Sequence, residues 1–423
     1  MRAVSRLRGV FPLLLAVAVA EGARRLLSPH ERPIEPVAVD LHAYFSAEEI
    51  ERGRRFARPQ LALGLLRSAV ELGSLTVLTR RPPALVARAW RRPVAGGAAV
   101  AVLLSVTLAG PPLPLSLISR RRAIAVGLDT QTWGAWALDL LKAGAIGSGF
   151  AAGAGAAVIA ATRRYPRVWW APAAAGSVGF GALLAALAPV VLDPLFNDFE
   201  PLAEGQTRGD VLALARAAGV KVGEVYSVDA SRRTTAANAY VTGLGPTKRV
   251  VLYDTLLDRY TRDEVRLVVA HELGHVRHRD VPRNVAYAAI IAPAVALAVQ
   301  RLSWAISPER GTPGTLPALA LSAALVSAPI GLIGNRLSRA VERRADGFAL
   351  ALAGAPEAFV SFERAIALQN VADLEPPRWV SRLLSSHPPT AERIGAAVAF
   401  AGTGPPGGAP KPAASAAPVR AKG

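Results

Sequence analysis

The sequence predicts a mainly α-helical, polytopic membrane bundle of about seven helices that carries a split α+β domain. Hydrophobic residues make up 52% of the 423 residues. Most of them fall in long runs rich in Ala, Gly and Leu, and several runs approach the ~20 residues needed to cross a bilayer. Polar sequence occupies residues 193–284 and resumes at 335–400, so the last apolar pair splits the soluble part in two.

The N-terminal segment, residues 1–30, begins with basic residues and continues with an apolar run from Gly9 to Ala20. This pattern is typical of a cleaved signal peptide and equally of a short first membrane helix. We favour the membrane helix because of the family resemblance that the later motifs carry.

Membrane helices and their connecting loops are expected over residues 31–192. Residues 30–59 are polar and charged, which predicts a helix at the membrane interface. Four spans follow: Gln60 to Thr79, Ala95 to Leu117, Trp133 to Ala161 and Trp169 to Leu192. Four charged residues lie in or beside these spans, and we expect them to face the interior of the bundle because charges avoid lipid. They are Arg67, Glu71, Asp139 and Lys142.

A membrane hairpin is expected over residues 285–334. Its apolar runs are Val285 to Val299 and Leu316 to Ile333, and Gln300 leaves the first run short for a span. Residues 193–284 and 335–400 then form the two parts of the soluble domain. Residues 401–423 are rich in Gly, Pro and Ala, which predicts a disordered tail.

Charge and cysteine content narrow the function classes. Lys and Arg number 49 against 31 Asp and Glu, but the basic residues are spread over short loops. Such residues flank membrane helices and contact anionic lipids, so membrane lipids are expected partners and nucleic acid is not. The sequence has no Cys, so any metal must be held by His, Asp or Glu.

A metal-site motif, His-Glu-Leu-Gly-His, occupies residues 271–275. Thr261 and Glu264 have the spacing of a capping box, which predicts a helix that begins there and runs through the motif. His271 and His275 would share one face of this helix and can bind one metal ion. Glu272 can then accept a proton from a metal-bound water. The expected cofactor is one Zn²⁺ per chain.

A third ligand is needed, because catalytic zinc takes three protein ligands and keeps one position open. Glu342 and Asp346 are four residues apart on a predicted helix. We expect Glu342 to be the third ligand and Asp346 to accept the other N–H of a ligand imidazole. The alternative is that Glu342 is an exposed residue that pairs with neighbouring arginines.

These motifs, with an apolar hairpin between them, resemble the integral-membrane metallopeptidase family of type 1 CAAX prenyl proteases and HtpX-like proteases. Other segments that resemble this family are Leu192–Asn197, Ser231–Tyr240, Lys248–Leu256, and Ser386–Pro389 with Arg393. Residues 130–134 resemble the prenyl-protease branch in particular. The resemblance covers about residues 40–400. It implies a zincin-type catalytic domain above a chamber enclosed by membrane helices.

The substrate-binding residues follow from a predicted hairpin. Residues 238–241 and 249–253 are β-rich stretches joined by Gly and Pro. An exposed edge beside the metal can take an extended substrate as an added strand, so Asn238, Ala239 and Tyr240 are the expected substrate-binding residues. His387 and Arg393 are expected to stabilise the oxyanion. The alternatives are that His387 begins a rigid turn and that Arg393 lies on a solvated helix face.

The expected function is therefore that of a zinc metalloendopeptidase in the cell membrane, which the chain crosses several times. Its expected substrate is a peptide or protein, and the resemblance suggests one with a prenylated C-terminus. Two alternatives stay open: an HtpX-like protein quality-control protease, and a zinc-binding membrane scaffold without catalysis. The presence of Glu272 argues against the scaffold.

Overall fold

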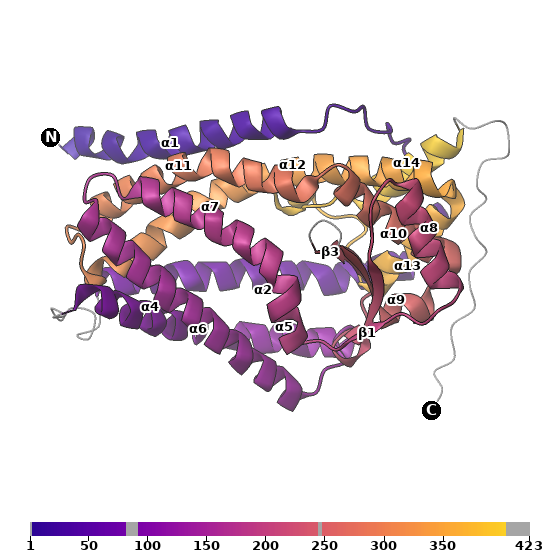
Figure 1. Cartoon of the computed structure of the whole chain (residues 1–423), viewed down its shortest axis with the longest axis horizontal. Coiled ribbons are helices and arrows are strands. Elements are labelled where there is room, and N and C mark those ends of the chain that lie inside the picture. Colours follow the sequence, from indigo (N-terminus) through magenta and orange to yellow (C-terminus); the bar gives the residue numbers. More distant parts are fainter. Residues whose placement is uncertain (1, 82–91, 244–247, 403–423) are drawn as a thin grey trace.

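The structure is a computed structural model that describes residues 2–81, 92–243 and 248–402. Long helices lie side by side along its longest axis, and a small sheet with shorter helices gathers at one end (Figure 1). The predicted fold class, a mainly α membrane bundle with an α+β domain, is confirmed. The predicted disordered tail lies outside the described residues from position 403 onward.

The bundle contains eight of the described helices. They are α1 (Arg2–Leu27), α2 (Ala47–Arg80), α4 (Pro93–Ala109), α5 (Leu113–Ala125), α6 (Trp133–Arg164), α7 (Trp170–Leu187), α11 (Asp280–Ile306) and α12 (Leu316–Ala353). By length and hydropathy, five described helices can cross a membrane, and the pair α4 and α5, bent by 49°, makes a sixth span. These correspond to six of the seven expected spans. Helix α1, the seventh, packs through Ala16 and Ala20 against Ala294 of α11 and Val326 of α12.

Helix α2 differs from the sequence prediction, which separated an interfacial helix within residues 30–59 from a span beginning at Gln60. Ser46 and Glu49 form a capping box, and the helix then continues for 34 residues to Arg80. Pro59 lies inside it and removes one backbone donor without ending the helix. The separation was wrong because a change from polar to apolar composition does not by itself end a helix.

Helix α11 is longer than the predicted run from Val285 to Val299, and its length makes it a candidate span. Gln300, which ends the apolar run, is fully buried and donates its side-chain amide to the backbone oxygen of Arg167 at 2.9 Å. This donor therefore has a partner inside the protein, whereas the side-chain oxygen of Gln300 accepts no hydrogen bond from the described residues.

The α+β domain has a four-stranded sheet in the order β1-β2-β4-β3. The strands are β1 (Phe199–Pro201), β2 (Glu224–Val228), β3 (Ala239–Thr242) and β4 (Arg249–Tyr253). The antiparallel pair β3–β4 confirms the predicted hairpin, and β2 lies parallel to β4. Strand β3 is therefore an edge of the sheet, as an added substrate strand requires.

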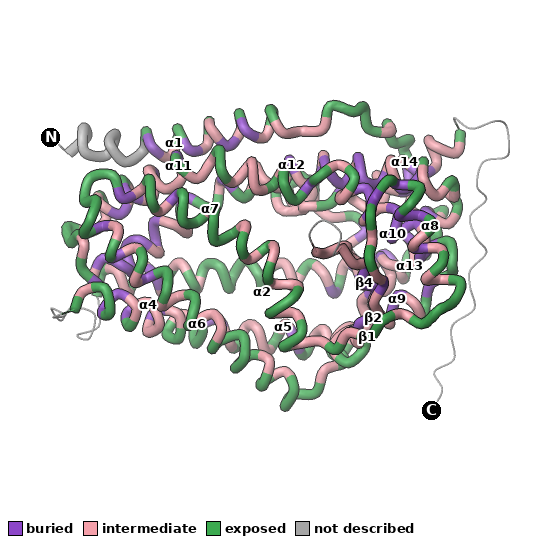
Figure 2. Tube along the Cα trace, in the orientation of Figure 1, coloured by how far each residue is buried: buried purple, intermediate pink, exposed green. Residues whose placement is uncertain are grey.

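Helices α8 (Gln206–Ala217), α9 (Asp254–Arg259), α10 (Arg262–Arg277), α13 (Pro356–Gln369) and α14 (Thr390–Gly402) complete this domain. Its core packs Val225 and Val250 of the sheet against Val211 of α8 and Val269 of α10. Buried residues concentrate here, whereas much of the bundle's surface is exposed (Figure 2). That distribution fits a bundle whose outer surface faces lipid.

The bundle and the domain are joined through the loop between α5 and α6. Asp129 and Thr234 form an isolated β-bridge, and the backbone N–H of Thr130 donates to the oxygen of Arg233 at 3.1 Å. This loop therefore holds the segment that leads directly into edge strand β3.

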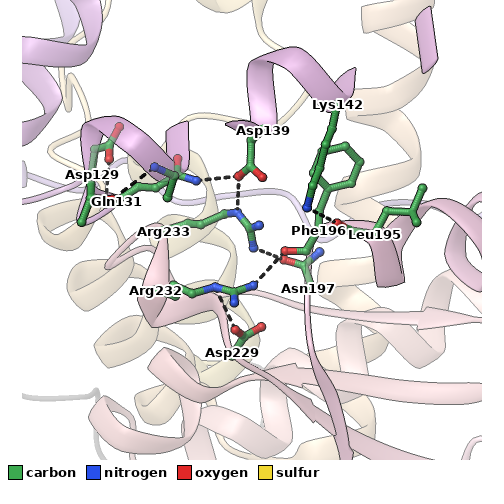
Figure 3. Close-up of polar contacts among 12 residues, drawn as sticks. Asp129, Gln131, Asp139, Lys142, Leu195, Phe196, Asn197, Asp229, Arg232 and Arg233 are labelled. Atoms are coloured by element: carbon green, nitrogen blue, oxygen red, sulfur yellow. Dashed lines mark hydrogen bonds and ion pairs between the residues drawn. The ribbon is translucent and has the colours of Figure 1, made fainter. Parts of the chain in front are cut away.

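Charged side chains of α6 reinforce this joint (Figure 3). Asp139 accepts hydrogen bonds from Gln131 at 2.5 Å and from Arg233 at 3.0 Å, and Arg233 also donates to Asn197 at 2.8 Å. Lys142 donates to the backbone oxygen of Leu195 at 3.0 Å. Both charges on α6 thus contact the segments beside the α+β domain. Their counterparts on α2, Arg67 and Glu71, are exposed, and their place in a chamber stays a prediction.

Candidate metal centre and active site

Helix α10 places the metal-site motif. The predicted capping box is confirmed, because the Thr261 side chain accepts from the Glu264 N–H and Glu264 returns a bond to the N-cap backbone. The helix buries Val265, Val269 and Leu273 in the core of the α+β domain. His271 and His275 are then left on a face that meets α12.

Gly274 allows α10 and α12 to approach closely. A Cβ atom at this position would lie 3.1 Å from Cδ1 of Phe348 and 3.5 Å from Cα of Ala345. Contacts this tight leave little room for a larger residue. The close approach brings Glu342 of α12 opposite the two histidines.

The three expected metal ligands lie together. Nε2 of His271 is 3.1 Å from Nε2 of His275 and 3.3 Å from Oε2 of Glu342, and Nε2 of His275 is 3.7 Å from Oε1 of Glu342. Tetrahedral zinc with ligand bonds of ~2.0–2.1 Å holds its ligand atoms about 3.3 Å apart. Buried Oε2 of Glu342 also lacks a hydrogen-bond partner among the described residues. The donor set therefore fits one small divalent cation.

Asp346 lies where the sequence placed it, with Oδ1 2.9 Å from Nδ1 of His271. Arg393 donates two hydrogen bonds to the Asp346 carboxylate, at 2.9 and 2.6 Å, and forms an ion pair with Glu363 at 2.6 Å. The guanidinium of Arg393 is thus bound by two carboxylates. Arg393 therefore contacts Asp346, and Asp346 in turn contacts the expected metal ligand His271.

Sequence reasoning missed Asp280, which is 4% exposed. Its Oδ2 lies 2.9 Å from Nδ1 of His275, and it also contacts Arg283 and Arg344. Arg279 adopts a left-handed conformation (φ 56°) and forms the turn that directs Asp280 back toward His275. An aspartate five residues after the second histidine was the available signal, but helical spacing does not predict a contact across such a turn.

Carboxylates dominate the electrostatics of this site. Burial lowers the pKa of His271, but the neighbouring carboxylates of Asp346 and Glu342 outweigh burial and raise this pKa to about 10. Burial raises the pKa of Glu272, and His271 and His275 oppose that increase. The carboxylates around His271 therefore favour positive charge at this position, which a bound cation would supply in place of a proton.

A cavity of about 130 Å³ lies beside the motif and is lined by His271, Glu272, Asn238, His387 and Arg393 among others. Nε2 of His387 is 3.4 Å from Oε2 of Glu342, although most of the His387 side chain is exposed. The structure thus brings Asn238 and His387 to the motif.

The other two expected substrate-binding residues, Ala239 and Tyr240, follow Asn238 on β3. The side chain of Ala239 is buried in the domain core. Both residues therefore offer a substrate chiefly the backbone of an edge strand.

Comparisons with known proteins agree with this geometry. The sequence model of peptidase family M48 matches residues 201–401, and a model described as CAAX prenyl protease N-terminal, five membrane helices, matches residues 30–198. An uncharacterized metalloprotease, YhfN, of Bacillus subtilis (strain 168) is 30% identical over 67% of this chain and 68% of its own length. A CAAX prenyl protease 1 homolog of Oryza sativa subsp. japonica is 31% identical over 49% of this chain, which spans about half (51%) of that relative.

Among solved structures, the crystal structure of S. mikatae Ste24p matches with a TM-score of 0.76 and 21% sequence identity. The match covers 93% of this chain and 98% of that chain, and it is a likeness of fold. Both parts of the sequence therefore match one family, and the candidate spans place the protein in a membrane. The chain belongs to peptidase family M48 and is a membrane metalloendopeptidase.

Proposed function

We propose that His271, His275 and Glu342 hold one Zn²⁺ per chain and that the protein uses it to hydrolyse peptide bonds. The observation that carries this proposal is the convergence of three donor atoms from α10 and α12 within 4.8 Å of one another. Nitrogen and carboxylate donors in this number match catalytic zinc sites, which keep a fourth position open. When bound, zinc supplies Lewis acidity and makes water nucleophilic near neutral pH.

Glu272 is the proposed general base. Its carboxylate accepts a proton from the attacking water as the oxygen–carbon bond forms at the scissile carbonyl. It then gives that proton to the amine nitrogen as the carbon–nitrogen bond breaks. The raised pKa of Glu272 suits this exchange, because a buried carboxyl holds and releases a proton closer to neutral pH.

His387 and Arg393 take different roles in this proposal. His387 lines the cavity and reaches to 3.4 Å from Glu342, so it can donate to the oxyanion that develops on the carbonyl oxygen. Arg393 is bound by Asp346 and Glu363, so we assign it to positioning Asp346, which in turn orients the His271 ring.

The substrate is proposed to be a peptide or protein bound in extended form along edge strand β3. Asn238 lines the cavity beside Glu272 and would position the substrate backbone at the entry to this strand. We further propose that the preferred substrates carry a prenylated C-terminus. Support comes from residues 30–198, where a CAAX prenyl protease N-terminal model matches outside the peptidase region itself.

Cleavage of matched farnesylated and unmodified peptides, in detergent with zinc, tests this function. Preference for the farnesylated peptide is the expected result. Equal cleavage of both peptides would refute the prenyl preference and favour a quality-control protease of the HtpX type.

The Glu272→Gln variant is the blank for this assay. It should retain zinc and lose turnover, because the amide cannot accept the proton. Wild-type protein that binds zinc but matches the blank would instead favour a non-catalytic scaffold.

A further inference from the structure

A cavity of about 620 Å³ lies at the end of the bundle far from the three metal donors. Helix α11 runs from Asp280, beside His275, to Ile306, close to this cavity, and its 27 residues span about 40 Å at 1.5 Å per residue. The residues that line the cavity come from three segments of the chain, within residues 162–169, 303–307 and 309–319, and do not include every residue of these segments. They are the junction of α6 with α7, the end of α11, and the connection into α12.

Three arginines give this cavity a positive charge: Arg163, Arg167 and Arg310. One carboxylate, Glu309, also lines it and accepts a hydrogen bond from Thr312 at 2.9 Å. Among the described residues, none of the three arginines forms an ion pair with a carboxylate. Guanidinium groups stay charged and present several N–H donors in a geometry that matches phosphate.

Each arginine makes a contact with its surroundings in the protein. The guanidinium carbon of Arg310 lies 4.5 Å from the ring centre of Trp304. The backbone oxygen of Arg167 accepts the amide of buried Gln300, and Cγ of Arg163 lies close to Gly311. Stacking of Arg310 and packing of the Arg163 stem reduce the freedom that these two side chains would lose on binding a ligand.

Part of the cavity lining is apolar. Trp169, Ala318 and Leu319 line it and are buried, and Trp169 and Leu319 belong to a cluster with Leu316 at the start of α12. These residues lie at the ends of candidate membrane spans, where tryptophan marks the membrane interface. The cavity therefore offers cationic groups beside apolar side chains at the ends of candidate spans.

We propose that this cavity is a binding site for the phosphate group of an anionic phospholipid. Arg163, Arg167 and Arg310 would bind the phosphate, and the wall at Trp169 and Leu319 would contact the first part of the acyl chains. Basic pockets between membrane helices bind anionic headgroups in this way. Free phosphate offers the same anionic oxygens without the chains, so the two sources can be separated by experiment.

The test uses the full chain, delipidated in a neutral detergent. Its Tm is measured against phosphatidylglycerol, phosphatidylcholine and inorganic phosphate. We expect a saturable rise in Tm with phosphatidylglycerol and none with phosphatidylcholine. Arg163→Gln combined with Arg310→Gln should raise the phosphatidylglycerol concentration that gives the half-maximal rise in Tm at least about tenfold. A hydrogen bond to a charged group is worth about that factor in affinity.

Arg164→Gln is the matched control. This residue lies next to Arg163, stacks on Tyr165 with its guanidinium carbon 5.1 Å from the ring centre, and does not line the cavity. Its removal should leave the response intact. A response lost equally in Arg164→Gln would mean that diffuse surface charge explains the effect, and the proposal would fall.

Ser307→Trp tests the cavity while leaving all three arginines in place, because an indole at this position would fill space that the headgroup needs. Loss of the phosphatidylglycerol response in this variant supports the site. A response that persists in Ser307→Trp and in the arginine variant, or an equal response to phosphatidylcholine, overturns it. A rise in Tm with inorganic phosphate alone, abolished by the arginine variant, would replace the lipid with free phosphate as ligand.

A second measurement applies if the double arginine variant fails to fold. The lipid retained by Arg310→Gln is then compared with that retained by wild type, using native mass spectrometry. Equal retention by the two proteins counts against the site.

Discussion

Oδ2 of Asp280 lies 2.9 Å from Nδ1 of His275, across the turn between α10 and α11. The equivalent contact on the other histidine is made by Asp346, whose Oδ1 lies 2.9 Å from Nδ1 of His271. Each imidazole therefore has its own carboxylate on the nitrogen that faces away from the donor cluster. Such partners fix the ring orientation and raise the basicity of the nitrogen that would bind a metal.

Replacing Asp280 with Asn should lower zinc affinity by about 10–100-fold, the range usual for such partners of ligand histidines. Competition with a chelator of known affinity measures the change without relying on activity. Asp263→Asn is the control, because Asp263 is an exposed carboxylate in the first turn of α10, the helix that carries His275. Wild-type affinity in Asp280→Asn would show that the contact does not support a metal ligand.

The contrast between Asp346 and Asp280 shows what the sequence can reveal about this site. Glu342 and Asp346 share a helix, so their spacing of four residues is enough to place them on one face. Asp280 reaches His275 through a left-handed residue, Arg279, and no periodicity describes that turn.

The fold likewise has features that the local sequence predicts and features that it does not. Apolar runs predicted about seven spans, and six of them match candidate spans of the described residues. These were predictable because hydrophobicity and length are properties of the local sequence. The joint in which Arg233 meets Asp139, 94 positions away in the sequence, depends on tertiary packing and had no local signal. The parallel pairing of β2 with β4 also depends on tertiary packing, because the residues that strands bury in a common core determine which strands pair.

The ion pair between Arg393 and Glu363 leads to a prediction about pH. Burial raises the pKa of Glu363 from its ordinary value of 4.5 to about 7. The charge of Arg393 opposes this rise but does not cancel it. The folded state then binds the proton more tightly than the unfolded chain. Its contribution to stability is fully present below pH 4.5 and is lost as pH rises toward 7.

Wild-type protein should therefore lose more stability between pH 5 and pH 8 than Glu363→Gln, in which this carboxyl group is absent. Thermal unfolding of both proteins in detergent with zinc, at several pH values, provides the comparison. Parallel curves for the two proteins would show that Glu363 does not titrate in this range.

The backbone of edge strand β3 allows a test of substrate binding. The N–H of Tyr253 donates to the backbone oxygen of Asn238, so the backbone of Asn238 is hydrogen-bonded to β4. The N–H of the next residue, Ala239, does not donate to β4 but to the Asn238 side-chain oxygen, at 2.9 Å. By the alternation of antiparallel strands, the N–H of Val241 also points away from β4. An added substrate strand would accept a hydrogen bond from it.

Val241→Pro removes that donor without removing a ladder bond to β4. We expect kcat/KM to fall about tenfold, the factor that one hydrogen bond is worth, with zinc content unchanged. Val241→Ala keeps the N–H and controls for loss of the side chain. Unchanged kcat/KM in a folded Val241→Pro protein would rule out substrate pairing at this position.

Arg233 links Asp139 of α6 with Asn197 and lies five residues before Asn238 (Figure 3). If this joint holds β3 in register with the metal site, Arg233→Gln should loosen the segment around residues 230–242. Faster amide hydrogen exchange there, with a higher KM, is the expected result. Zinc affinity should not change, since none of the three donors contacts Arg233.

Arg232→Gln is the matched control for Arg233→Gln. Its guanidinium is half-exposed and pairs with Asp198 and Asp229, outside the bundle helices. A role of the joint in substrate binding requires that Arg233→Gln change hydrogen exchange and KM while Arg232→Gln leaves both near wild type. Equal effects would assign the loosening to general loss of surface charge. No effect from either variant would mean that the backbone bonds of Thr130 and Thr235 to their partners hold β3 without the side chains.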